Sequence, residues 1–190
     1  MRLILASASA RRAELLKLMG LEFCVSVSGA DEDMPPCPPE EAVQRLALRK
    51  AEAVQCDLSD CCVVGADTIV CVEGQTLGKP AGAADARRML RLLSGRTHTV
   101  YTGVAVLAGA QTQTCCDAAQ VTFAELSEAE IDAYVRTGEP MDKAGAYGIQ
   151  GAGCVFIERI EGSYFTVMGL PVQKLYQMLR LAGLHPGWQA

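Results

Sequence analysis

Residues 61–73 read Cys-Cys-Val-Val-Gly-Ala-Asp-Thr-Ile-Val-Cys-Val-Glu, which is two apolar runs separated by a short stretch with one carboxylate. Apolar runs of this length are typical of strands that are buried inside a sheet. The pattern predicts strands near 61–65 and 69–73, with Asp67 where the first strand emerges at its end. Taken alone, Asp67 suits an Asx-type turn as well as it suits catalysis.

On both sides of this stretch, apolar strand patterns alternate with helical periodicity, and no linker, charge block or repeat divides the chain. The other expected strands cover 2–6, 23–28, 97–108, 114–124 and 154–160, and the expected helices cover 10–19, 40–54, 83–93, 128–137 and 171–182. A turn at Gly109-Ala110 suggests a hairpin. We therefore expect a single domain over residues 1–190, an α/β sheet with helices on its faces.

Composition sets outer limits on function. The chain has 190 residues, 50% of them apolar and 21% charged, which excludes disordered classes. With a net charge of −5, the chain as a whole does not attract nucleic-acid polymers or anionic membranes electrostatically. No uncharged stretch is apolar enough to span a membrane and the apolar start is too short for a signal peptide, so we expect a soluble, cytoplasmic protein. The nine cysteines lack Cys-x-x-Cys spacing and mostly lie in apolar runs, which favours buried thiols over a zinc site.

The segment Ser7-Ala8-Ser9-Ala10-Arg11-Arg12 joins the first expected strand to the first expected helix. Such a junction binds anions, because its N–H groups are free and the helix dipole is positive there. Two arginines in a first helical turn oppose that dipole, yet Arg11 is in line with Leu15 on the inward side. A phosphate cradle explains this better than a pair of solvated arginines beside a plain N-cap at Ser9.

Two lysines are further candidates for anion binding. Lys50 lies in the middle of the apolar stripe that Val43 and Leu46 mark on the expected helix over 40–54. A buried ammonium without a partner is costly, so this side chain either snorkels to water or contacts a bound anion. Lys79 stands before a proline, which holds its backbone extended, and by itself it also suits an exposed loop.

The tract Asp142-Lys143-Ala144-Gly145-Ala146-Tyr147-Gly148-Ile149-Gln150-Gly151 is too rich in glycine for a helix and too apolar for a solvent loop. Its backbone could approach a ligand closely, or it could pack a tight crossover. It is neither a Walker loop nor a dinucleotide-binding fingerprint, because no strand–turn–helix unit surrounds it.

Six motifs, taken together, resemble the Maf family in order and spacing over nearly the whole chain. They are Ser7-x-Ser9-x-Arg11-Arg12, 65–68, 77–80, 94–102, 139–151 and 167–171, with Ala10 in place of the family's usual proline. The resemblance implies an α/β fold with a mixed sheet, helices on its faces and a central cleft, similar to inosine triphosphate pyrophosphatases. It also implies cleavage of a nucleoside triphosphate between its α- and β-phosphates, with a divalent cation such as Mg²⁺, Mn²⁺ or Co²⁺.

The resemblance further implies a role for each matching residue. Asp67 matches the family's proton acceptor, and Glu32 is a candidate metal ligand. The phosphate-binding positions are Ser7, Ser9, Arg12, Lys50 and Lys79, with Arg11 as a further cation. A homodimer is expected from the habit of the family.

Three positions bear on the substrate. Family members that act on dTTP and UTP carry Arg, Thr and Gln where this chain has Arg11, Thr68 and Gln150, and the branch that acts on 7-methyl-GTP carries Trp, Gln and Glu. A glutamine amide both donates and accepts, as the N3–H and carbonyl edge of uracil or thymine requires, whereas a carboxylate only accepts. We therefore expect a dTTP and UTP pyrophosphatase that removes non-standard or excess nucleotides. The alternatives are the same reaction on CTP, 7-methyl-GTP or modified pyrimidine nucleotides, or a nucleotide-binding regulator of cell division that inhibits septum formation.

Overall fold

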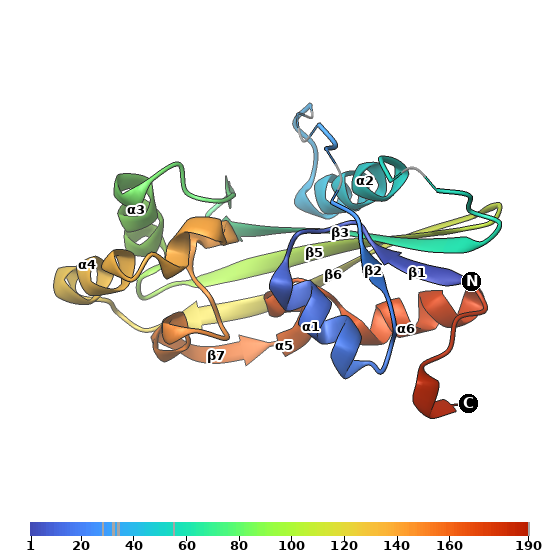
Figure 1. Cartoon of the computed structure of the whole chain (residues 1–190). Helices are drawn as coiled ribbons and strands as arrows, with labels where there is room; N and C mark the ends of the chain where they lie inside the picture. The colour runs from blue at the N-terminus through green and yellow to red at the C-terminus, as the bar shows by residue number, and fades with distance from the viewer. Residues whose placement is uncertain (28, 32, 34, 55, 190) are drawn as a thin grey trace. The chain divides into compact units, whose positions relative to one another are not determined.

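The computed structural model describes residues 1–27, 29–31, 33, 35–54 and 56–189, and Figure 1 follows the chain through them. The strands are β1 (Arg2–Leu5), β2 (Cys24–Val25), β3 (Cys61–Val72), β4 (Gln75–Leu77), β5 (Thr97–Ala108), β6 (Gln111–Phe123) and β7 (Ile157–Glu161). They form a seven-stranded sheet in the order β2-β1-β3-β5-β6-β7, with β4 paired to β3. The strand β1 pairs in parallel with β2 and β3, and β6 pairs antiparallel with β7, which confirms the mixed α/β sheet.

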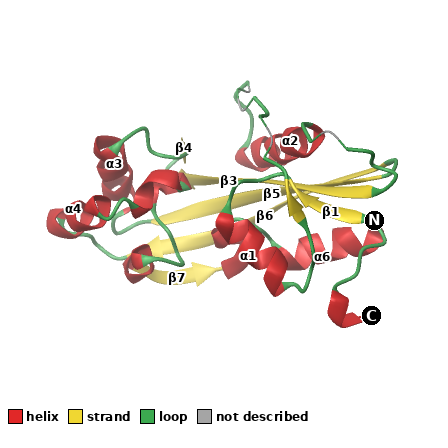
Figure 2. Cartoon of the chain, viewed as in Figure 1, coloured by secondary structure: helices red, strands yellow, loops and turns green. Residues whose placement is uncertain are grey.

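Helices surround this sheet, as Figure 2 shows in red. The α-helices are α1 (Ala10–Leu18), α2 (Pro39–Glu52), α3 (Ala83–Leu93), α4 (Glu128–Arg136), α5 (Tyr164–Met168) and α6 (Val172–Leu181), and the 3₁₀ turns are η1 (Glu139–Asp142), η2 (Ala144–Ala146), η3 (Ala152–Phe156) and η4 (Gly187–Gln189). Ser9 caps α1, and Ser127 and Glu130 form a capping box on α4. Within the described ranges, no helix is long and apolar enough to cross a membrane.

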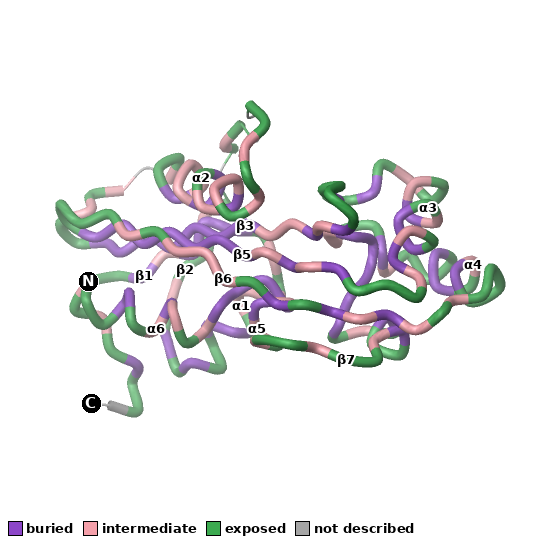
Figure 3. The backbone as a smooth tube through the Cα atoms, turned by 180° about the vertical axis from the view of Figure 1, so that it is seen from behind, coloured by how far each residue is buried: buried purple, intermediate pink, exposed green. Residues whose placement is uncertain are grey.

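Residues 61–72 correct the sequence prediction most. They form one strand, β3, and not two, so Asp67 lies inside a strand and not at its emerging end. Gly65 suggests an interruption because glycine weakens a strand interior. In the structure the strand continues through this point, because a helix packs directly on Gly65. In Figure 3, most of β3 is coloured as buried.

Other elements also differ from the prediction. The strand expected over 154–160 begins as the 3₁₀ turn η3, closed by the bond from Cys154 N to Gly151 O, and becomes β7 only at Ile157. Of the strand expected over 23–28, Ser28 lies outside the described residues, and among the others only Cys24 and Val25 form a strand, β2, at the edge of the sheet. Neither β4 nor α5 was expected. All nine thiols are free, but only Cys61 and Cys62 are fully buried.

Contacts divide the chain into two compact units. Unit 1 comprises the described residues of Met1–Asp67, Thr102–Asp117 and Gly169–Ala190, and unit 2 comprises Thr68–Tyr101 and Ala118–Met168. In unit 1, α2 covers one face of the strands and α1 and α6 lie on the other (Figure 1 and Figure 2). The core under α2 consists mostly of small residues, including Ala6, Ala47, Ala51, Val63 and Ala105.

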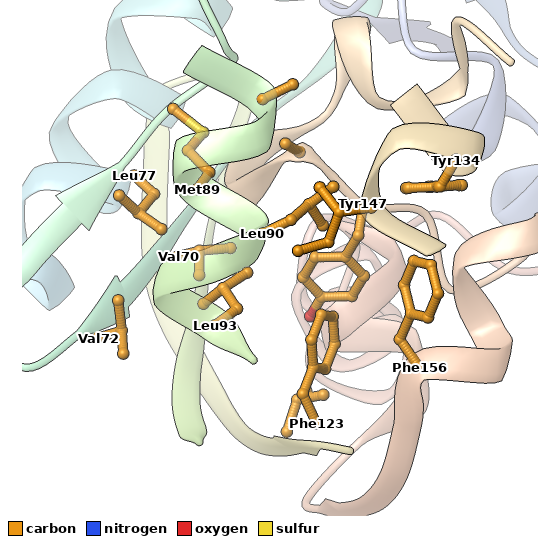
Figure 4. Packing of buried hydrophobic residues seen from close by; sticks show 14 of the residues in the cluster. Val70, Val72, Leu77, Met89, Leu90, Leu93, Phe123, Tyr134, Tyr147 and Phe156 are labelled. Carbon is orange, nitrogen blue, oxygen red and sulfur yellow. The ribbon is translucent and has the colours of Figure 1, made fainter. Parts of the chain in front are cut away.

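The core of unit 2 is aromatic at its centre. Phe123, Tyr134, Tyr147 and Phe156 gather beside the aliphatic side chains of β3 and α3, as Figure 4 shows. The rings of Phe123 and Tyr147 meet edge to face with centroids 4.8 Å apart. This core fixes Tyr147, which lies in the middle of the glycine-rich tract.

Candidate active site

The helix α2 lies against the sheet at two glycines, Gly65 on β3 and Gly103 on β5. A Cβ atom at Gly65 would lie 2.1 Å from the carbonyl oxygen of Ala47, and one at Gly103 would lie 2.2 Å from that of Val43. Only glycine allows the helix backbone to come this close. Side chains two residues apart on a strand share a face, so Asp67 lies on the same face of β3 as Gly65, toward α2.

The close packing of α2 on Gly65 and Gly103 brings Lys50 to Asp67. The Nζ atom of Lys50 donates a hydrogen bond of 2.6 Å to Oδ1 of Asp67. Both side chains are largely buried, with 15% and 12% of their surface exposed. The burial of Val43 and Leu46 confirms the apolar stripe around Lys50. The sequence alternatives for Lys50 were water or a bound anion, and the structure adds a carboxylate of the chain itself.

The junction after β1 forms a second polar cluster in unit 1. Because Leu5 is paired with Val64 in the parallel β1–β3 ladder, Ser7 leaves the sheet at the level of the residues just before Asp67. Ser7 is buried, and its hydroxyl accepts hydrogen bonds from Ser9 N at 3.2 Å and from Arg12 Nη1 at 3.1 Å. Three predicted phosphate-binding residues therefore lie together.

Arg12 is held from a second side by Gly169, which sequence reasoning missed. Its Nε atom donates to the carbonyl oxygen of Gly169 at 2.8 Å. Gly169 has a φ of 106°, a backbone conformation that favours glycine. The motif over 167–171 was a signal for this position, but nothing in the sequence connects it to Arg12. Arg11 lies half-buried in the first turn of α1.

Three further predicted site residues, Thr68, Lys79 and Gln150, belong to unit 2. Thr68 is half-buried on β3, Lys79 is exposed after β4, and Gln150 is exposed between η2 and η3. The loop that carries Lys79 is tied to the glycine-rich tract, because Gly145 N donates to the carbonyl oxygen of Gly78 at 3.0 Å. Lys79 and the tract are therefore brought together within unit 2.

The tract itself is organised by Glu139, a second residue that sequence reasoning missed. One carboxylate oxygen, Oε1, accepts from the hydroxyl of Tyr134 at 2.8 Å and from Gly153 N at 3.3 Å, and Oε2 accepts from Ala152 N at 2.9 Å. Partial burial raises the pKa of Glu139, but these hydrogen bonds and the charge of Lys143 outweigh it and hold the pKa below its usual range. The carboxylate is therefore ionised at neutral pH.

The acidic segment after β2 carries the candidate metal ligand. Glu32, the candidate metal ligand, lies outside the described residues. Its neighbours Asp31 and Asp33 are exposed, and the backbone carbonyl of Asp33 accepts from Arg49 Nη1 at 2.8 Å. Among the residues that the structure describes, no three histidine, cysteine or carboxylate side chains gather as a metal site.

Comparison with known proteins identifies the family of the chain. The family model of Maf-like proteins matches residues 2–182. Proteins named dTTP/UTP pyrophosphatase from Bacillus thuringiensis subsp. konkukian (strain 97-27) and from Bacillus anthracis are each 51% identical to this chain over 180 residues. In both comparisons the match covers 94% of this chain and 94% of the relative. The chain therefore belongs to the Maf family.

Proposed function

We propose that this chain hydrolyses dTTP and UTP between the α- and β-phosphates, releasing the nucleoside monophosphate and pyrophosphate and so removing non-standard or excess nucleotides. The observation that carries the proposal is the buried pair of Lys50 and Asp67 beside the Ser7–Arg12 junction. Asp67 on β3 and the junction that follows the adjacent strand β1 would then supply a carboxylate base and phosphate-binding groups within one unit. The names of the Bacillus relatives support the choice of dTTP and UTP.

Asp67 would act as the general base toward the attacking water. The Asp67 carboxylate would accept the proton of that water, and the ammonium of Lys50, which donates to it, would hold it in place. An ammonium has three N–H donors, so Lys50 can hold Asp67 and still donate to a phosphate oxygen. Lys50 would then hydrogen-bond both to the base, Asp67, and to a phosphate of the substrate.

Ser7, Ser9, Arg11 and Arg12 would bind the phosphates from the start of α1, and Lys79 would add a further cation. The guanidinium plane of Arg12 is oriented before substrate arrives, because Gly169 and Ser7 already hold two of its nitrogens. Planar guanidinium groups suit phosphate because they donate two parallel hydrogen bonds.

Gln150 would read the base, with Arg11 and Thr68 completing the pyrimidine form of the site. The Gln150 amide can accept from N3–H of uracil or thymine and donate to the neighbouring carbonyl. Gln150 is exposed, which leaves it accessible to a ligand.

A divalent cation fits Asp67 without a cage of protein ligands. Mg²⁺ is usually bound by one or two carboxylates together with substrate phosphates and waters, and Asp67 offers one such carboxylate at the predicted phosphate site. When bound, the cation neutralises charge on the phosphate oxygens. Glu32 as a further ligand, a homodimer and a cytoplasmic location stay predictions from the sequence.

The direct test is an assay of the purified protein on UTP, dTTP, CTP, GTP and 7-methyl-GTP with Mg²⁺, Mn²⁺ or Co²⁺. We expect pyrophosphate and monophosphate from UTP and dTTP above the others. Preferred hydrolysis of 7-methyl-GTP or CTP would favour the other specificities. Tight nucleotide binding without turnover under every condition would favour the regulator of cell division, and release of orthophosphate would contradict the proposed bond.

A further inference from the structure

The carboxylate of Glu139 lies inside the turn that carries Gln150. Its two oxygens accept from the backbone N–H groups of Ala152 and Gly153, which follow Gln150 by two and three residues. The hydroxyl of Tyr134 donates to the same carboxylate and accepts from Gly148 N at 3.0 Å, two residues before Gln150. One acidic side chain, directly and through Tyr134, therefore holds the backbone on both sides of Gln150.

The packing around this carboxylate is tight. A Cβ atom at Gly151 would lie 2.2 Å from Oε1 of Glu139 and 2.5 Å from Oε2. A Cβ atom at Gly153 would lie 2.7 Å from the hydroxyl of Tyr134. Gly151 and Gly153 thus let the backbone close around the Glu139 carboxylate, and they need not be explained by approach of a ligand.

The start of the turn is fixed independently. The hydroxyl of Tyr147 lies 2.9 Å from Nε2 of His98 on β5, and both side chains are buried. Between Tyr147 and Ala152, the Gln150 side chain is exposed. The turn therefore has anchored ends and an exposed amide between them.

We propose that Glu139 is a positioning residue for base recognition, because it holds the turn over 148–153 in the one conformation that presents the Gln150 amide to a pyrimidine. The inference rests on the proposed function, since it takes Gln150 as the group that reads the base. Donors and acceptors that are fixed before binding discriminate between ligands better than mobile ones, because their ordering costs no free energy at the moment of binding.

The experiment compares wild type, Glu139→Gln, Gln150→Ala and the double variant, with Glu158→Gln, an exposed carboxylate on β7, as the matched control. The Glu139→Gln amide keeps the size of the side chain but turns an NH₂ group toward an N–H or O–H donor. We measure kcat/KM for UTP and CTP, which differ at the edge that Gln150 would read. We expect the UTP preference over CTP to fall about 5- to 150-fold in Glu139→Gln, the range for one lost hydrogen bond.

The double variant tests whether the two residues act together. If Glu139 acts through Gln150, the double variant loses no more of the UTP preference than Gln150→Ala does. An equal loss on UTP and CTP, or a loss in the double variant that is the product of the two single losses, would overturn the inference. Glu158→Gln should match wild type.

Hydrogen exchange separates this inference from the proposed function. In Glu139→Gln, the amides of Ala152 and Gly153 should exchange faster, while those of β5 keep their protection. Unchanged exchange at 152 and 153 would overturn the positioning role whatever the activity. Absence of UTP hydrolysis by the wild type, with faster exchange in the variant, would instead reject the proposed function and retain Glu139 as the group that holds the turn.

Discussion

Asp67 in unit 1 is buried and Glu139 in unit 2 is half-buried, and the partners of the two carboxylates differ in kind. Asp67 is held by the ammonium of Lys50, a charged group at the end of a long side chain. The Glu139 carboxylate is held by two backbone N–H groups and a phenol, and the ammonium of Lys143 donates to its backbone carbonyl and not to its carboxylate. A side-chain cation can turn toward an incoming phosphate, whereas backbone donors are fixed by the fold.

Under the two proposals, this difference would separate the reacting carboxylate, Asp67, from the positioning one, Glu139. A general base must lose or share its partner as a proton moves, which a flexible cation allows. Glu139 has neutral donors on both oxygens, so this carboxylate is most stable in the hydrogen-bonded arrangement that the structure shows. The burial of a carboxylate therefore says less about its role than the kind of donor that it meets.

The largest effect on activity is expected from Asp67→Asn. If Asp67 is the general base, turnover of UTP should fall by about 100-fold or more, with nucleotide binding and folding retained. Steady-state kinetics and thermal unfolding measure both, and Asp60→Asn, an exposed carboxylate of the same unit, serves as the control. Near-normal turnover in Asp67→Asn would place the base elsewhere and remove the distinction between the two carboxylates.

Lys50→Met tests the other half of the pair. Methionine suits the apolar stripe of α2, but it leaves Asp67 buried without its cation. We expect a loss of about 1–3 kcal/mol in the free energy of unfolding, together with a large loss of turnover. Adding Asp67→Asn should recover most of the stability, because a neutral amide needs no counter-charge. A single variant as stable as wild type would show that the ion pair adds nothing, and Lys17→Met on the exposed face of α1 is the control.

Gly103→Ala tests the close packing of α2 on the sheet that brings Lys50 to Asp67. The new methyl group would meet the carbonyl oxygen of Val43, so the helix must move away. We expect a loss of about 1–3 kcal/mol in stability, the range for overpacking, and reduced turnover as Lys50 shifts. Gly29→Ala adds the same methyl group in open space and should change neither. Equal free energies of unfolding of the two variants in urea would contradict the close packing of α2 on Gly103.

Gln150→Glu tests whether the turn that Glu139 holds in unit 2 carries the group that reads the base. A carboxylate would face the base carbonyl, which removes one hydrogen bond and sets two acceptors against each other. We expect kcat/KM for UTP and dTTP to fall about 5- to 150-fold, with a smaller fall for 7-methyl-GTP, whose guanine donors suit a carboxylate. An equal loss on all three nucleotides would leave Gln150 as a packing residue.

The smallest effect concerns His98, which anchors the same turn without carrying charge. Burial lowers the pKa of His98 from 6.5 to about 4. Between these values the unfolded chain binds a proton that the folded chain does not, so stability is lost as the pH falls from about 6.5 toward 4. Between pH 6.5 and 5.5 we expect a loss of about 1 kcal/mol.

Urea unfolding at several pH values measures this slope. It should flatten in His98→Gln and persist in His185→Gln, because His185 is exposed. An unchanged slope in His98→Gln would mean that other groups cause the acid sensitivity.

The helices and strands could largely be predicted, because the faces they bury repeat along the sequence with a period of 3.6 or 2. The predicted junction from Ser7 to Arg12 is one cluster, because its members are close in sequence and share one turn. Prediction failed at β3, where Gly65 looks like an interruption and is the contact point of a helix. A glycine gives the same local signal in either case.

The mixed α/β class, the apolar stripe that holds Lys50, the glycine-rich tract and the family can all be predicted from the amino-acid sequence. The contact of Lys50 with Asp67, the bond from Arg12 to Gly169 and the place of Glu139 inside the turn of Gln150 follow only from the folded chain. The physical reason is that periodicity reports which face of an element is buried but not which other face it meets. Each of these partners is chosen by packing between elements that are distant in the sequence.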